Sequence, residues 1–481
     1  MKPAQSPLSS ESARALLGAG GLYTVGRLLQ LLGGLLVVPI LTRSLTPADF
    51  GTVAAALVVV QLLALVAAVG LPAALTRIIF DPDGGEHARG IVLAVFMFAL
   101  PAAGVAHLTG PFWTGVFREL EYGRAAQTAV LTAVPLAVLT ATLSVFQAQR
   151  QAVRFVVIAL LGTVGAQVVG IALLLTDPDR SAVRYLLGYL IGSSLAAVLA
   201  VGFTGLSARV LIDRRPLRAA LAVGLPTVPH VLGLSLLSAG DRVLIERLHG
   251  LGAVGRYQVA YALGTLGLVA LTALNNAWAP LVYGASPERR WQELAATSTA
   301  LSHLATLSAA GLAFAAPLVV RVAAPPDYGH RTMGITAAIV ALAVVPYVVY
   351  LSRVHVLFQT TRTRALAVIT PLTAVGNIVL NLLVLPVAGL PGAAGVTVAT
   401  YAAQATLVHR RASRLAAVQW NLREDARTWV VAACLVALGA ALPATGAWVA
   451  VRFLAALGFV AMALMRIRRL VDPTGSRQKG A

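Results

Sequence analysis

The sequence is divided into fourteen apolar runs, most of them near twenty residues long and separated by short polar connectors. About 20 apolar residues in a helix span the hydrocarbon core of a bilayer, and only helices and closed barrels satisfy their backbone hydrogen bonds there. The chain is therefore predicted to be an all-α integral membrane protein with about 14 transmembrane helices. The runs lie at 16–41, 50–76, 90–108, 125–146, 153–176, 183–206, 219–240, 256–283, 295–320, 332–352, 364–386, 391–408, 428–444 and 446–465.

The composition agrees with a membrane protein and argues against other classes. Hydrophobic residues make up 58% of the 481 residues and charged residues 11%, with a mean hydropathy of +0.83. A water-soluble domain of this size could not cover its surface with so few charges. The net charge of +19 comes from basic residues in the connectors, a pattern typical of membrane topology, so no nucleic-acid partner is expected.

An enzymatic role is not expected. The sequence has no phosphate-binding glycine loop, no nucleophile elbow and no His-Glu-x-x-His motif, and its connectors are too short for a soluble catalytic domain. The single cysteine, Cys434, allows neither an intramolecular disulfide nor a cysteine metal cluster. We therefore predict no catalytic residues, no metal site and no cofactor.

The distribution of basic residues predicts the orientation. With a cytoplasmic N-terminus and fourteen alternating spans, 25 Lys and Arg residues lie on the cytoplasmic side and 11 on the opposite side. Basic residues are enriched in cytoplasmic connectors, so both termini are predicted to be cytoplasmic. The first helix is expected to act as its own insertion signal.

A weak internal repeat indicates two halves. A shift of 204 residues places Arg43 on Arg247 and Gly51 on Gly255, just after the first span of each half. Six spans per repeat make the repeats parallel, related by an axis along the membrane normal. Two such six-helix lobes around a central cavity, followed by a C-terminal helix pair, suit alternating access. The predicted divisions are an N-terminal lobe at 1–206, a cytoplasmic linker at 207–218, a C-terminal lobe at 219–410, a basic cytoplasmic loop at 411–427, and the last two spans with a basic tail at 428–481.

The first apolar run contains one charge, Arg27. Tyr23, Arg27, Gln30 and Gly34 recur at helical spacing and therefore form one polar stripe on one helix face. A cation held inside the membrane beside hydrogen-bonding neighbours suits an anion such as a diphosphate. The alternatives are a structural ion pair and an arginine that extends to the inner headgroups.

Asp241 and Arg242 are expected to close the seventh span. Asp241 could pair with Arg242, or with Arg43 or Arg247 on the same membrane side. Such a pair would act as a gate that breaks when the cavity opens outward. An interfacial cap is the alternative.

Two further polar pairs are interpreted structurally. Asn377 and Asn381 share one helix face and are expected to join helices by hydrogen bonds. Tyr257 and Tyr261, one turn apart, could stack on a sugar, but the aromatic belt at the membrane interface is the favoured interpretation.

Several segments resemble one known family. They are LTRSLTPADFGTVA near the first two spans, SAGDRVLIERLHGLGAVGRYQVAYALG and the following NNAWAPLVY, and the Asn-x-x-x-Asn helix with its Gly-x-x-Gly-Ala-Ala turn in TRTRALAVITPLTAVGNIVLNLLVLPVAGLPGAAGVTVATY. Together they resemble the polysaccharide-biosynthesis flippases of the multidrug/oligosaccharidyl-lipid/polysaccharide exporter superfamily. The similarity runs over nearly the whole chain in the right order.

The resemblance implies a specific transport function. Such a protein moves an undecaprenyl-diphosphate-linked oligosaccharide from the inner to the outer leaflet of a bacterial inner membrane, for O-antigen, capsule or exopolysaccharide synthesis. Arginines of a central cavity would bind the diphosphate; Arg27 fits by position, and Arg43 and Arg247 are weaker candidates nearer the outer face. The implied partners are the polyprenyl-diphosphate-linked glycan and membrane lipid, with a polysaccharide polymerase as a further candidate.

Three other functions remain open at this stage. A lipid II flippase has a similar first-span arginine, but no second arginine lies clearly within the second or eighth span here. A cation-coupled multidrug exporter of the same fold would need acidic residues in the cavity, and the first span has none. An integral membrane glycosyltransferase or polymerase would need a large extramembrane loop.

Overall fold

The structure is a computed structural model that describes residues 26, 29–30 and 32–471, and all regular secondary structure in that part of the chain is helical. A helix at Leu32–Ser44 comes first. The following helices are α2 Pro47–Ala67, α3 Leu71–Ile78, α4 Gly84–Leu108, α5 Gly110–Thr114, α6 Arg124–Ala148, α7 Ala152–Leu160, α8 Ala166–Leu175, α9 Ala182–Thr204 and α10 Arg209–Ile212. The remaining helices are α11 Arg215–Gly224, α12 Val228–His249, α13 Leu251–Gly264, α14 Leu266–Gly284, α15 Arg290–Ala323, α16 His330–Leu342, α17 Val344–Gln359, α18 Leu366–Ala412, α19 Leu422–Ala441 and α20 Trp448–Val471.

The helices confirm the predicted all-α membrane fold. Eleven helices in the described residues are long and apolar enough to cross a membrane. The longest, Thr363–Ala412, covers two of the predicted spans. Gly389 lies between them and breaks the helix with non-helical angles (φ 56°, ψ −147°). Glycine reaches such angles without the steric penalty of a side chain. Each of the fourteen apolar runs has described residues in a helix.

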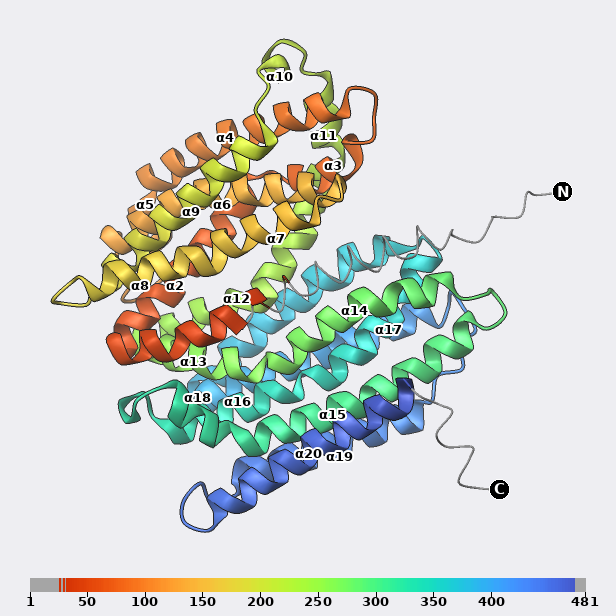
Figure 1. Cartoon of the computed structure of the whole chain (residues 1–481). Helices are drawn as coiled ribbons and strands as arrows, with labels where there is room; N and C mark the ends of the chain where they lie inside the picture. The colour runs from red at the N-terminus through yellow and green to blue at the C-terminus, as the bar shows by residue number, and fades with distance from the viewer. Residues whose placement is uncertain (1–25, 27–28, 31, 472–481) are drawn as a thin grey trace.

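The helices form two groups joined by α12 (Figure 1). The group drawn from red to yellow includes α3, α4, α6 and α9, and the group drawn from green to blue includes α13 to α20. Helix α11 packs on α3 and α4 of the first group, whereas α12 packs on α18 of the second and on α2. The seventh span therefore contacts both groups. The division of the chain at 207–218 stays a prediction.

The last two spans pack on α15. Both α19 and α20 contact α15 on the face of the second group that is turned away from the first group (Figure 1). The side chain of Arg452 in α20 is 1% exposed and donates to the carbonyls of Phe314 in α15 (3.1 Å), Gly439 (2.6 Å) and Leu442 (2.6 Å). One arginine thus ties the connector between α19 and α20 to the second group.

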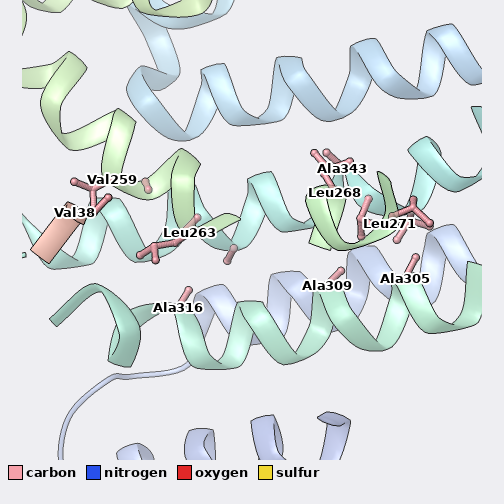
Figure 2. Close-up of a cluster of buried hydrophobic side chains, with 14 of the residues drawn as sticks. Val38, Val259, Leu263, Leu268, Leu271, Ala305, Ala309, Ala316 and Ala343 are labelled. Atoms are coloured by element: carbon pink, nitrogen blue, oxygen red, sulfur yellow. The ribbon is translucent and has the colours of Figure 1, made fainter. Parts of the chain in front are cut away.

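Small side chains allow close packing inside the second group. Figure 2 shows three alanines of α15, Ala305, Ala309 and Ala316, on the side of the helix that faces leucines of α13 and α14. Alanine lets neighbouring helices approach without loss of side-chain entropy. This buried cluster continues into α16 and α17.

The two groups touch through a pair of glycines. A Cβ added at Gly51 in α2 would lie 1.8 Å from the carbonyl oxygen of Leu251, and one at Gly255 in α13 would lie 2.1 Å from that of Pro47. These four residues are related in pairs by the 204-residue shift. The repeat found in the sequence therefore corresponds to a symmetric backbone contact between α2 and α13.

Candidate functional site

A polar pocket lies where the helix Leu32–Ser44 and α2 face α13 and α14. Its volume is about 290 Å³. Gln30 and Gly34, two members of the predicted stripe, line it. Tyr23 and Arg27, the other two members, lie outside the described residues. The polar lining residues are Gln30, Gln167, Tyr185, Gln258 and Thr265.

The described lining of this pocket combines these five polar side chains with a larger number of apolar ones, and it contains no acidic residue. Gln167 has a buried Oε1 without a hydrogen-bond partner in the described part of the chain, whereas the Oε1 of Gln258 accepts from Arg242. Neutral amides and hydroxyls can bind a polar ligand of either charge. The described residues of the lining offer no carboxylate with which to bind a cationic drug.

Asp241 and Arg242 lie inside α12 rather than at its end, which corrects the predicted end of the seventh span. The helix continues two turns beyond them to His249, and the two residues are only 2% and 5% exposed. Arg242 donates to Asp241 Oδ1 (2.8 Å) and, through Nε and Nη2, to Gln258 Oε1 (3.2 Å each). A buried, hydrogen-bonded ion pair explains why a charged pair is tolerated at this depth.

The tyrosines expected in the aromatic belt belong to this same buried cluster. The hydroxyl of Tyr257, which is 0% exposed, donates to Asp241 Oδ2 at 2.5 Å. The Arg242 guanidinium lies 4.0 Å from the ring centroid of Tyr261. The belt interpretation was wrong, because these rings satisfy the buried ion pair instead of facing the membrane interface.

Glu246, a residue that sequence reasoning missed, joins the two groups of helices. Its carboxylate is 0% exposed and accepts from the backbone N–H groups of Arg118 (2.7 Å), Glu119 (2.6 Å) and Leu120 (3.1 Å). In return, Glu119 accepts from the backbone N–H of Leu251 at 2.8 Å. No short-range pattern could have revealed contacts between residues some 130 positions apart.

Arg247, predicted as a substrate ligand, takes part in the same contact. It is exposed, and its Nη1 donates to the carbonyl of Phe117 at 3.3 Å. We call the contacts of Glu246, Arg247 and Glu119 with their partners the carboxylate clasp. Arg247 lies outside the described lining of the polar pocket.

Arg43, in the first half of the repeat, makes an equivalent contact with the second half. Its Nη2 donates to the carbonyl of Val322 (2.8 Å), and Thr42 Oγ1 donates to that of Ala323 (2.6 Å), both near the end of α15. Tyr328, in the connector after α15, donates to the carbonyl of Leu45 (2.9 Å). Burial raises the pKa of Tyr328 well above its usual range, so its hydroxyl keeps its proton. We call these contacts the hydroxyl clasp; Arg43 also lies outside the described lining of the pocket.

An apolar groove runs beside the polar pocket, on the other face of α2. Its volume is about 440 Å³, and the fourteen described residues that line it carry no charge. Leu57 of α2 lines the pocket, whereas Val58 and Leu62 line the groove. Gly240 and Val243, which flank the Asp241–Arg242 pair, also line the groove.

Asn377 and Asn381 make the hydrogen bonds expected of packing residues. Asn377 Nδ2 donates to Thr400 Oγ1 at 3.0 Å, across the kink of α18, and Asn381 Nδ2 donates to Asn377 Oδ1 at 3.0 Å. The pair thus holds the two arms of α18 together.

Solved structures of several transporters share this fold. The lipid II flippase MurJ in an inward closed conformation has a TM-score of 0.70 at 11% identity and covers 94% of this chain and 100% of its own. An inward-facing multidrug resistance MATE family transporter has a TM-score of 0.60 at 17% identity, covering 82% and 98%. The Vibrio cholerae MATE transporter VcmN has a TM-score of 0.55 at 15% identity, covering 84% and 98%.

The sequence itself matches one family. None of the curated proteins compared is similar enough in sequence to count as a relative. Residues 17–283, more than half of the chain, match the family described as polysaccharide biosynthesis protein. The chain is therefore a multi-pass membrane protein that belongs to the polysaccharide biosynthesis protein family.

Proposed function

We propose that this protein is a flippase that moves a polyprenyl-diphosphate-linked oligosaccharide across a bacterial inner membrane for polysaccharide synthesis. The observation that carries the proposal is the polar pocket between the two halves, lined by Gln30 and Gly34 of the stripe that contains Arg27. Membership of the polysaccharide biosynthesis family supports the glycan substrate. A cationic drug is a poorer fit, since the described pocket lining has no carboxylate.

The substrate has three parts that need different environments. Arg27 would bind the diphosphate by two-pronged hydrogen bonds, because a guanidinium matches the spacing of phosphate oxygens. The neutral amides of Gln30 and Gln258 suit sugar hydroxyls. The apolar groove beside α2 suits the polyprenyl chain. The chain would therefore stay in the bilayer, against the protein, while the headgroup crosses.

The two clasps suggest how the cycle would run. Both lie at the end of the molecule that charge bias predicts to face outward, and both join the two halves. In this conformation they would close the outer side of the pocket. Export would then require both clasps to break and the two halves to move apart at this end. Both termini would be cytoplasmic.

The experiment replaces Arg27 and measures export of the glycan beside the amount of inserted protein. Arg27→Ala and Arg27→Glu should abolish export, and Arg27→Lys should retain part of it, since lysine keeps the charge but loses the fork. All three should insert normally. Arg77→Ala is the matched control, because Arg77 is an exposed arginine at a helix end.

A structural ion pair at Arg27 predicts another pattern. The alanine and glutamate variants would then be poorly expressed, and neutralising an acidic residue elsewhere would rescue them. Normal export by well-expressed Arg27→Ala would remove the diphosphate site from this helix.

A further inference from the structure

A second pocket, which shares no described lining residue with the polar pocket, lies between α17, α18 and α19. Its volume is about 200 Å³. Its lining combines apolar side chains with three groups that carry or can carry charge, Arg353, His409 and Asp425. Trp429 forms a further part of the wall. No step of the proposed transport cycle uses these residues.

Arg353 is the central group of this pocket. It is 0% exposed, pairs with Asp425 through Nη2, and donates from Nη1 to Ser298 (3.1 Å) and Ser352 (2.7 Å). Its guanidinium also lies 3.9 Å from the ring centroid of Trp420. The Nε–H of Arg353 has no hydrogen-bond partner in the described part of the chain.

Three more buried nitrogens around Arg353 lack a partner within the described residues. They are His409 Nδ1, Trp420 Nε1 and Trp429 Nε1. An arginine Nε and an indole Nε1 can only donate, so whatever satisfies them must be a hydrogen-bond acceptor. Buried donors are rarely left unsatisfied, because the cost is about 1–3 kcal/mol each. Arg353, His409 and Trp429 line the pocket, whereas Trp420 lies outside its described lining, so the first three make the pocket suitable for a group rich in acceptor oxygens.

The position and the surrounding charge favour an anion from the membrane interface. Arg353 lies six residues before the end of α17, about 9 Å along the helix axis, and His409 and Asp425 lie near helix ends on the same side. Asp425 neutralises Arg353, but the adjoining segment 409–427 carries five exposed arginines against two acidic residues. Basic pockets between transmembrane helices at the cytoplasmic interface bind acidic headgroups.

We propose that the pocket between α17, α18 and α19 binds a phosphate group, with Arg353 and Trp429 as donors. At this depth the group would come from an acidic phospholipid of the inner leaflet; free phosphate offers the same chemistry. Bound there, it would bridge α19 to α17 and α18 and fix the last two spans against the second group of helices.

The test uses the full chain in detergent, titrated with phosphatidylglycerol or phosphatidylcholine and followed by native mass spectrometry and thermal unfolding. Phosphatidylglycerol should bind more tightly and raise the unfolding temperature more. Trp429→Phe keeps the ring but loses the N–H, and Arg353→Lys keeps a cation for Asp425 but loses Nε. Each should weaken phosphatidylglycerol binding about ten-fold. Trp291→Phe, at the start of α15 and outside the described lining of the pocket, should not.

A second titration, with inorganic phosphate, shows whether the bound phosphate group belongs to a lipid or is free phosphate. If phosphate at millimolar concentration displaces the lipid, or binds alone and is lost in Trp429→Phe, the pocket recognises the phosphate itself. If phosphatidylglycerol alone binds and both variants weaken it, the lipid is the ligand. Equal binding of the two lipids, or unchanged binding in both Trp429→Phe and Arg353→Lys, would overturn the proposal.

Discussion

The two clasps occupy equivalent places in the 204-residue repeat but use different chemistry. Thr42 corresponds to Glu246 and Arg43 to Arg247. Thr42 and Arg43 contact the last residues of the third span of the second half, and Glu246 and Arg247 contact the segment after the third span of the first half. Thr42 donates to one carbonyl of the other half, whereas Glu246 accepts three hydrogen bonds from backbone N–H groups of the other half. Hydrogen bonds to a charged acceptor are about twice as strong as neutral ones. The backbone contact between the two halves is therefore symmetric, whereas the two clasps are not.

The difference in hydrogen bonding between the clasps indicates which clasp should break first. A buried carboxylate with three donors is costly to release unless water replaces all three bonds. Each clasp also has one exposed arginine that donates to a carbonyl, so the difference lies in the remaining contacts. The neutral hydroxyl bonds of Thr42 and Tyr328 can break at lower cost. The backbone contact at Gly51 and Gly255 is the same on both sides and should behave symmetrically.

The largest expected effect is the loss of stability when alanine replaces a glycine of the symmetric Gly51–Gly255 contact. Gly51→Ala and Gly255→Ala each place a Cβ within about 2 Å of a backbone oxygen, so α2 and α13 must separate. Each should lower the free energy of unfolding by about 3 kcal/mol, by a similar amount for both. Thermal unfolding in lipid measures this. Gly252→Ala in α13 meets nothing within 4 Å and is the control; a Gly255→Ala protein as stable as this control would contradict the symmetric contact.

The next effect is on the carboxylate clasp. Glu246→Gln replaces a charged acceptor by an amide that can accept on one side only, at a cost of about 2–3 kcal/mol. The ratio of closed to open molecules should fall about 30-fold or more. Distances between spin labels on the exposed residues Glu121 and Arg331 would report it. Glu288→Gln, in a connector at the opposite end, should leave the distances unchanged.

The smallest effect belongs to the hydroxyl clasp. Thr42→Val keeps the shape of the side chain but loses the bond to Ala323, at a cost of about 1 kcal/mol, or roughly five-fold in the same ratio. The same spin-label pair measures it. Thr52→Val, whose hydroxyl bonds only within its own helix, is the control. If Thr42→Val opened the molecule as far as Glu246→Gln, the inference that the carboxylate clasp is the stronger of the two would be refuted.

The spans could be predicted from the sequence because hydrophobic length is a local property. Their ends were less predictable when charges lay inside them. Asp241 and Arg242 seemed to end the seventh span, since charged residues usually mark the interface. Tyr257 and Gln258, on the next helix, satisfy that pair inside the protein, and this partnership has no local signal in the sequence.

Contacts between distant segments were the least predictable part of the site. The repeat placed Gly51 on Gly255, but their contact requires the two halves to pack about the repeat axis. The sequence gives no signal for the role of Glu246, because its donors are backbone N–H groups that nearly every residue carries. Gln30 and Gly34 line the pocket as one helix face, and the role of Arg27 beside them stays a prediction.

The most direct test locks the carboxylate clasp and measures transport. With Cys434 replaced by serine, cysteines at Arg118 and Arg247 would be joined by a short thiol-reactive cross-linker that a reductant cleaves. The account predicts that the cross-linked protein in proteoliposomes moves no lipid-linked oligosaccharide and that reduction restores transport, whereas either single-cysteine protein transports throughout. Undiminished transport by the cross-linked protein would contradict alternating access through this end.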